Sequence, residues 1–235
     1  MELTACLQKL EQLGTEDHRI LLRRLGVPEP LYGVSSTDLI RLADELGRDH
    51  VLAAELWDSG NNEARILATR LVDPTTVERA LCERWVGSIN ATVLADCFAR
   101  GIVGPSPHAR ALLQIWLLDS REYVLRTAYC LLGWLTQETS TLAEEFLTEQ
   151  LTLLEANLHA APNAARETMN NALIAIGTVN EHLRDLALAA ADRIGPVTFE
   201  RGGIQCKAFD ALVFIQKTWQ RTTTLARRQG RKGHA

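Results

Sequence analysis

The sequence lacks the long apolar run that a membrane-spanning helix requires. No apolar stretch among its 235 residues approaches the roughly 20 residues that cross a bilayer. Its first residues, Met-Glu-Leu-Thr-Ala-Cys, also lack the charged-then-apolar pattern of a secretory signal. We therefore predict a cytoplasmic protein with no membrane partner.

Cysteine pairs at metal-binding or redox spacing are also missing. The five cysteines are scattered and odd in number, and no two of them form a Cys-x-x-Cys pair. This pattern argues against a disulfide framework and a thiolate zinc site, and it favours reduced thiols. Glycine-rich phosphate loops and the nucleophile elbow of hydrolases are absent as well. We expect neither a metal nor a small-molecule cofactor.

Two-residue alternation, the pattern of half-buried strands, never extends over more than a few positions. Nearly every segment instead has the 3.6-residue period, which predicts about a dozen helices with short connections. Paired helices at intervals of roughly 30–45 residues have the scale of HEAT-type repeats. The predicted fold class is all-α, a HEAT/armadillo-like α–α superhelix, and a compact orthogonal bundle is the alternative.

Capping and breaking residues place several of these helices. Thr15, Ser35 and Asn61 each stand where an N-cap precedes a helical segment. Asp73 and Pro74 open another helix, because proline is tolerated in a first helical turn. Towards the C-terminus we predict helices at 120–135, 138–158, 163–176, 180–194 and 209–219, with a loop at 195–207.

Charge is unevenly distributed along the chain. The formal net charge is −4, but residues 221–235 contain five basic residues and no acidic one, so that the first 220 residues carry −9. We predict one helical-repeat domain over 1–220 and a basic, disordered tail over 221–235. The tail either adds attraction to phosphates or serves only as a solubilising end.

Arg126 lies off the apolar stripe of its predicted helix, beside Tyr129 and Gly133. A guanidinium in this position is suited to contact an anionic ligand. Glu122, four residues earlier, offers the alternative of an exposed ion pair along the helix.

Several phrases, in order, resemble the HEAT-like DNA alkylation repair family, the AlkD-type alkylpurine DNA glycosylases. The resemblance extends over roughly residues 20–195, and no single phrase is specific by itself. The phrases are Tyr-Gly-Val at 32–34, Leu-Trp-Asp-Ser with Glu-Ala-Arg at 56–65, Trp-Leu-Leu-Asp-Ser with Val-Leu-Arg-Thr-Ala at 116–128, and Asn-Asn-Ala-Leu with Ile-Gly at 170–177.

The resemblance implies a superhelix whose concave, positive face holds duplex DNA. Active family members cut the N-glycosidic bond of cationic alkylpurines such as 7-methylguanine and 3-methyladenine, without drawing the base into a pocket. A carboxylate stabilises the positive charge that develops on the sugar. Two indole rings attract the cationic base, and an arginine holds phosphate.

Carried over residue by residue, the family's carboxylate falls on Asp96 and its arginine on Arg126. The two tryptophan positions fall on Thr92 and Asn171, so both indoles are absent. We expect these two residues and Arg166 to contact DNA. The helical phase points Asp96 away from the core stripe, although an ion pair with Arg100, one turn later, is the alternative.

The predicted function is DNA binding, with or without hydrolysis of alkylpurine glycosidic bonds. The alternatives are a non-catalytic paralogue that binds a DNA structure or damage, and a helical-repeat scaffold that binds protein. We expect a monomer whose partner is double-stranded DNA, and association with the nucleoid if it binds DNA.

In the loop at 196–211, Arg201 stands where one subgroup has histidine, so the Asp/His/Cys set of a metal site is incomplete. We expect this loop to fold back over the last helices.

Overall fold

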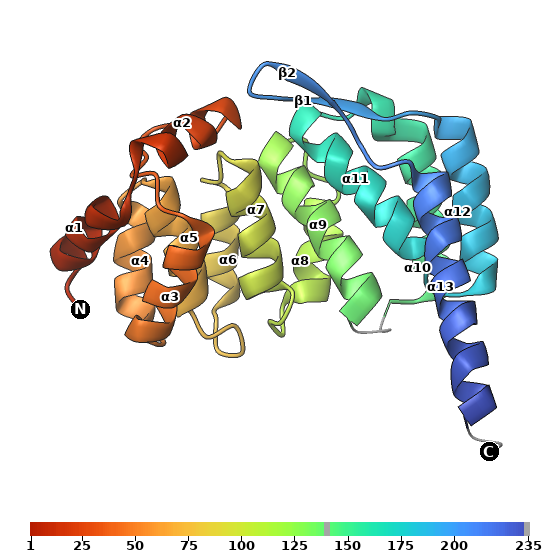
Figure 1. Cartoon of the computed structure of the whole chain (residues 1–235), viewed down its shortest axis with the longest axis horizontal. Helices are drawn as coiled ribbons and strands as arrows, with labels where there is room; N and C mark the ends of the chain where they lie inside the picture. The colour runs from red at the N-terminus through yellow and green to blue at the C-terminus, as the bar shows by residue number, and fades with distance from the viewer. Residues whose placement is uncertain (139–141, 233–235) are drawn as a thin grey trace. The chain divides into compact units, whose positions relative to one another are not determined.

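The computed structural model describes residues 1–138 and 142–232, with the side chains of this part up to Arg221. Within these residues the chain forms thirteen α-helices and one two-stranded hairpin, which confirms the predicted all-α class (Figure 1). The chain divides into two compact units. The first unit comprises residues 1–131 and 200–206, and the second comprises 132–199 and 207–235. The predicted single domain over 1–220 stays a prediction, because compact units do not by themselves decide whether they fold separately.

The first unit consists of helices in sequential order joined by short connections (Figure 1). Helix α9 begins in this unit and continues into the second. The helices are α1 (Leu3–Leu13), α2 (Glu16–Arg24), α3 (Ser36–Leu46), α4 (His50–Asp58), α5 (Asn62–Leu71), α6 (Arg79–Val86), α7 (Thr92–Phe98), a π-helix (Ala99–Val103), α8 (Ala109–Trp116) and α9 (Glu122–Glu138).

The predicted N-caps of this unit are confirmed. The side chains of Thr15, Ser35 and Asn61 accept hydrogen bonds from backbone N–H groups in the first turns of α2, α3 and α5. Each cap satisfies one of the amide groups that a helix start leaves without an intrahelical partner, which stabilises a helix by about 1 kcal/mol. The caps therefore fix where these helices begin.

Aromatic packing forms the centre of the first unit's core. The rings of Trp57 and Trp85 stack with centroids 4.2 Å apart. Phe98 packs against both rings and against Trp116. Each of the three tryptophans is at most 2% exposed, and aromatic pairs of this kind add about 0.5–1.5 kcal/mol beyond the area that they bury. The tryptophans of this unit are core residues.

A buried carboxylate joins α5 to the segment before α3. Glu63 is 2% exposed, and its Oε1 accepts hydrogen bonds from the backbone N–H groups of residues 32–34, at 3.1, 2.6 and 3.3 Å. Gly33 has φ +79°, and a Cβ there would lie 2.3 Å from the carbonyl oxygen of Thr15. Two of the phrases that resemble the family therefore meet in one structural contact.

The second unit continues the helical architecture with longer helices (Figure 1). Trp219 packs beneath the guanidinium of Arg184 and donates from Nε1 to the carbonyl of Gly177 at 2.8 Å. The elements are α10 (Glu144–Asn157), a 3-10 turn (Leu158–Ala160), α11 (Asn163–Ile176), α12 (Glu181–Ile194), β1 (Thr198–Arg201), β2 (Ile204–Lys207) and α13 (Ala211–Lys232).

The segment predicted as a loop at 195–207 contains the hairpin of β1 and β2. Gly202 and Gly203 form its turn with φ +56° and +79°, and two consecutive positive φ values are those of a tight hairpin turn that glycine favours. A Cβ on Gly202 would lie 1.8 Å from the carbonyl oxygen of Arg24. The turn therefore packs on the end of α2 and not, as predicted from the sequence, over the last helices.

Two helix boundaries differ from those predicted. Helix α6 begins at Arg79 and not at Pro74, because the Asp73 carboxylate accepts hydrogen bonds from the N–H and hydroxyl of Thr75 and closes a turn there. Helix α13 continues to Lys232, past the predicted end near Trp219. The side chains of 222–235 lie outside the described part, and the disordered tail stays a prediction. Among the described residues, no helix has the length and apolar character to cross a membrane.

Candidate nucleic-acid interface

Asp96 lies on α7 with its carboxylate turned away from the core. Leu94, Ala95 and Phe98 of the same helix are completely buried, whereas the Asp96 side chain is 30% exposed. This placement follows from the helical period, because Leu94, Ala95 and Phe98 share one side of α7 and Asp96 falls on the other. The predicted orientation of Asp96 is therefore found in the structure.

Arg126, on α9, binds this carboxylate through both of its oxygens. Its Nε donates to Oδ1 at 3.0 Å and its Nη2 donates to Oδ2 at 2.7 Å. Nε also lies 3.3 Å from the carbonyl oxygen of Thr92, one turn before Asp96. This two-point geometry matches the planar guanidinium to the planar carboxylate and makes a strong charge-assisted contact.

Burial distinguishes the two partners. The Arg126 side chain is only 3% exposed, against 30% for Asp96. The guanidinium of Arg126, predicted from the sequence to contact a phosphate, is instead buried against Asp96. The two predicted residues do lie together, with Arg126 fixing the orientation of the carboxylate. Direct contact of Arg126 with phosphate stays a prediction.

Two further arginines lie near this pair. Arg70 on α5 and Arg100 in the π-helix are both exposed, and neither forms an ion pair among the described residues. The neighbouring Cys130 sulfur and, more weakly, the Asp96 carboxylate raise the pKa of Arg100. The alternative in which Asp96 pairs with Arg100 is therefore not found. We call Asp96, Arg126, Arg70 and Arg100 together the Asp96 surface.

The charges of Arg70 and Arg100 both act on the thiol of Cys97, the residue that follows Asp96. Burial raises its pKa, and the positive charges of Arg70 and Arg100 oppose that shift. The two exposed arginines therefore act on one point next to Asp96. Three guanidinium groups against one carboxylate give the Asp96 surface a local excess of positive charge, which attracts anions.

A cavity of about 440 Å³ adjoins this surface in the first unit. Arg48, Arg70, Gly47 and Gly101 line it together with Asp44. Arg48 donates to the backbone carbonyl oxygens of Arg70 and Val72 and so caps the end of α5. The side chain of Arg70 forms no hydrogen bond or ion pair with another described residue.

The remaining predicted residues are partly exposed. Thr92 begins α7, and Asn171 lies on α11 in the second unit; both are half-buried. Neither carries a ring that stacks on a base. Arg166, also on α11, donates from Nε to the carbonyl of Ala161 at 2.9 Å. Contacts of these three residues with DNA stay predictions.

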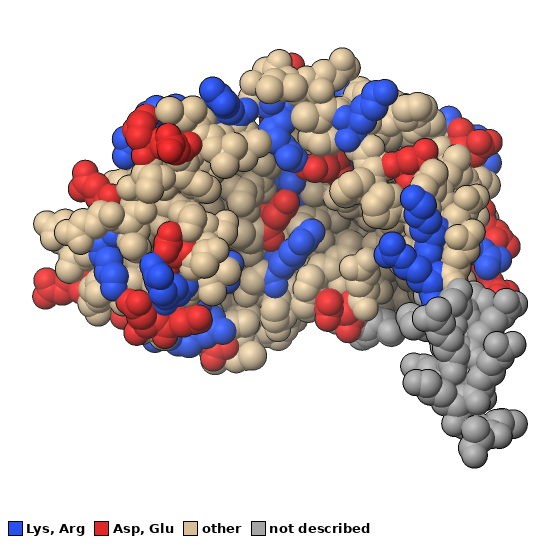
Figure 2. Space-filling model, in the orientation of Figure 1, with Lys and Arg blue, Asp and Glu red and all other residues tan. Residues whose placement is uncertain are grey.

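The charges on the face drawn in Figure 2 are mixed, with acidic and basic side chains interspersed. Attraction to an anion on this face thus depends on local clusters and not on one continuous basic surface. In the part of the chain whose side chains are described, no three His, Cys, Asp or Glu residues lie together as metal ligands would.

Arg70 was not predicted as a site residue, and Arg100 was predicted only as a possible partner of Asp96. Arg70 stands at the end of α5, and its position beside Asp96 depends on the packing of α5 against α7. Helical spacing did place Arg100 one turn after Asp96, and this was the only signal that pointed to the cluster.

Comparison with known proteins adds a family to this geometry. A family model described as DNA alkylation repair enzyme matches residues 6–204. The chain is 28% identical to the uncharacterized protein Lin0241 of Listeria innocua over 223 residues, which cover 92% of this chain and 95% of that protein. It is 27% identical to the uncharacterized protein Lmo0209 of Listeria monocytogenes over 224 residues, with the same coverage.

A solved structure has a similar fold. It is described as a new family of proteins related to the HEAT-like repeat DNA glycosylases with affinity for branched DNA structures. The TM-score is 0.85 at 24% identity, and the match covers 94% of this chain and 95% of that one. The predicted helical-repeat fold is confirmed.

Proposed function

Because the chain belongs to the DNA alkylation repair enzyme family, we propose that it binds double-stranded DNA and recognises a distorted or damaged structure without removing a base. The Asp96 surface of the first unit makes the central contact. The observation that carries this proposal is the bidentate pair of Asp96 with the buried Arg126, flanked by two exposed arginines that have no carboxylate partner.

The exposed arginines support the binding of phosphate. Arg79, elsewhere in the first unit, already pairs with Glu83 at 2.8 Å. Arg70 and Arg100 have no such partner among the described residues, so a phosphate does not have to displace a carboxylate from them. Phosphate contacts of this kind supply most of the affinity for DNA irrespective of its sequence, and they weaken as salt rises.

The state of Asp96 argues against excision of a base. A carboxylate that assists glycosidic cleavage has to direct its negative charge at the developing sugar cation. Here a guanidinium engages both carboxylate oxygens and compensates the charge. Thr92 and Asn171 offer no π face to a cationic purine, and the first unit's three tryptophans are at most 2% exposed.

The fold relative suggests which DNA to test first. Its description attributes to it an affinity for branched DNA structures, and we propose the same preference for this chain. The test compares a four-way junction with a linear duplex of the same arm sequence, at several salt concentrations. We expect tighter binding of the junction. Equal affinities would contradict the preference, and no binding of either DNA at low salt would contradict DNA binding altogether and favour a protein partner.

Hydrolysis of alkylpurine glycosidic bonds is the second candidate function. The 30% exposure of the Asp96 side chain favours it, because solvent and substrate can reach the carboxylate despite its pairing. The test incubates a duplex containing 7-methylguanine with excess protein for hours and measures free base. Our proposal predicts no release above the rate without protein. Release that persists in Arg79→Ala, whose arginine pairs with Glu83, and is lost in Asp96→Asn, with both variants folded, would establish the enzyme.

A further inference from the structure

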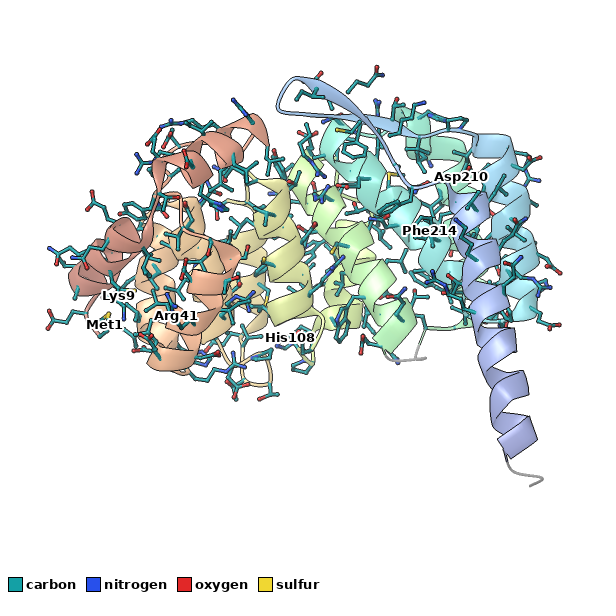
Figure 3. All side chains as sticks on the ribbon, viewed as in Figure 1. Met1, Lys9, Arg41, His108, Asp210 and Phe214 are labelled. Carbon is teal, nitrogen blue, oxygen red and sulfur yellow. The ribbon has the colours of Figure 1, made fainter. Side chains whose placement is uncertain are left out.

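A second cavity lies entirely within the second unit. It has a volume of about 510 Å³ and opens beside the first turn of α13. Asn170 of α11, the last turn of α12 with the chain that follows it, and residues 207–212 line it. Figure 3 shows Asp210 and Phe214 at the beginning of α13, next to this region. We call it the α13 cavity.

The α13 cavity offers hydrogen-bond donors and an acceptor that the fold leaves unused. Asn170 is 2% exposed; its Nδ2 donates to the carbonyl of Phe209 at 2.9 Å, while its amide oxygen has no partner among the described residues. At the start of α13, the side chain of Asp210 accepts from the N–H of Val213, and its backbone carbonyl accepts from the N–H of Phe214. The N–H groups of Ala211 and Leu212 have no acceptor among the described residues, as expected in a first helical turn.

One of the residues that line the cavity, Phe209, belongs to an aromatic pair. The rings of Phe209 and Phe214 lie with centroids 4.6 Å apart at 42°. Phe209 is 60% exposed and Phe214 is 41% exposed, and Phe209 lines the cavity itself. Neighbouring exposed aromatic rings on a folded protein mark a binding site more often than isolated apolar residues do.

The charged residues that line the α13 cavity indicate which class of ligand it can bind. The charged residues of the lining are Asp192, Asp210 and one basic residue, Lys207, so an isolated phosphate would meet a net negative site. A flat ring with its own donors and acceptors fits better, because Phe209 can stack on it and the carboxylates can accept from its amino groups. Nucleobases have this combination, and stacking on aromatic side chains tolerates any base.

We propose that the α13 cavity binds an unpaired nucleobase, stacked on Phe209, with its polar edge directed at Asn170 and the first turn of α13. This inference rests on the proposed DNA binding and deepens it. Junctions, bulges and damaged duplexes expose such bases, whereas an intact duplex does not. The α13 cavity thus supplies recognition of DNA structure, and the phosphate contacts of the first unit supply affinity.

The test uses the full chain and two matched duplexes. One contains a single unpaired 2-aminopurine, and the other contains 2-aminopurine paired with thymine. We expect the unpaired probe to bind more tightly and its fluorescence to change on binding. Phe209→Leu, which remains apolar but loses the ring, should weaken binding of the unpaired probe by roughly 5- to 150-fold. It should leave the affinity for the paired probe within about twofold, the size of effect expected when no contact is lost.

Two controls make the outcome decisive. Phe209→Trp keeps a stacking ring and should retain the preference for the unpaired probe. Leu153→Ala removes an exposed side chain of α10 that does not line the α13 cavity. This variant should bind both probes with the affinities of the wild type. Tight binding of the paired probe without preference for the unpaired one would overturn this inference alone. Binding of neither probe would overturn it together with the proposed function.

Discussion

Replacing Asp96 of the Asp96–Arg126 pair should lower the unfolding free energy more than replacing Arg126. Asp96→Asn keeps the shape of the side chain but leaves a guanidinium facing a neutral amide. Because the Arg126 side chain is 3% exposed, water cannot replace the lost carboxylate. Removing one partner of a buried pair costs about 3–5 kcal/mol of unfolding free energy, and we expect the lower end, about 3 kcal/mol, because Asp96 is partly hydrated.

The reciprocal change should be milder. Arg126→Met removes the buried charge and keeps an apolar stem, while the 30% exposed carboxylate of Asp96 gains water in its place. We expect Arg126→Met to lower the unfolding free energy by about 1–2 kcal/mol. Adding Arg126→Met to Asp96→Asn should therefore restore about 1–2 kcal/mol of unfolding free energy, since no buried charge remains. At this chain length each kcal/mol corresponds to a shift of roughly 2–4 °C in Tm.

Urea unfolding followed by far-UV circular dichroism measures all four proteins, with thermal melts as a second probe. The predicted order of stability places wild type first, then Arg126→Met and the double variant, and Asp96→Asn last. A double variant less stable than Asp96→Asn would refute the pairing. The double variant also serves as a folded control for any assay in which Asp96→Asn loses function.

Three further predictions follow from individual contacts. Glu63→Ala leaves three backbone N–H groups without an acceptor and should lower the unfolding free energy by at least about 3 kcal/mol in urea. Gly202→Ala places a Cβ 1.8 Å from a carbonyl oxygen and should speed amide hydrogen exchange in the hairpin turn, more than Gly203→Ala, which meets nothing within 4 Å. Burial raises the pKa values of Cys82 and Cys130 from 9.0 to about 11. Their contribution to stability is complete below pH 9, where the unfolded thiols stay protonated, and should be lost as pH rises from 9 to 11; replacing both with alanine should flatten this decline.

Local signals in the sequence predicted the helices well where a cap marked the start. Asn61, for example, accepts from the N–H group of Ala64, and both the residue type and the spacing were visible beforehand. The helix predicted at 163–176 is α11. The hairpin was not predicted because each of its strands has only four residues, although the Gly-Gly pair between the strands is a turn signal.

Side-chain roles that depend on packing were not predictable. Asp96, to which Arg126 donates, lies thirty residues away on another helix. Spacing along one helix suggested only Glu122 as a partner for Arg126 and only Arg100 as a partner for Asp96. Likewise Glu63, part of a phrase that resembles the family, fixes a neighbouring segment of backbone. A charged residue in a phrase that resembles the family can thus stabilise the fold and does not have to bind a ligand.

The central claim is that the Asp96 surface binds the DNA backbone. The most direct test measures junction affinity against salt for wild type, Arg70→Ala/Arg100→Ala and the control Arg79→Ala, whose arginine pairs with Glu83. We predict that the double variant binds more weakly at low salt and that its plot of log affinity against log salt is shallower by about 2, one for each lost phosphate contact. The control should match wild type. A double variant with the affinity and slope of wild type would contradict the claim.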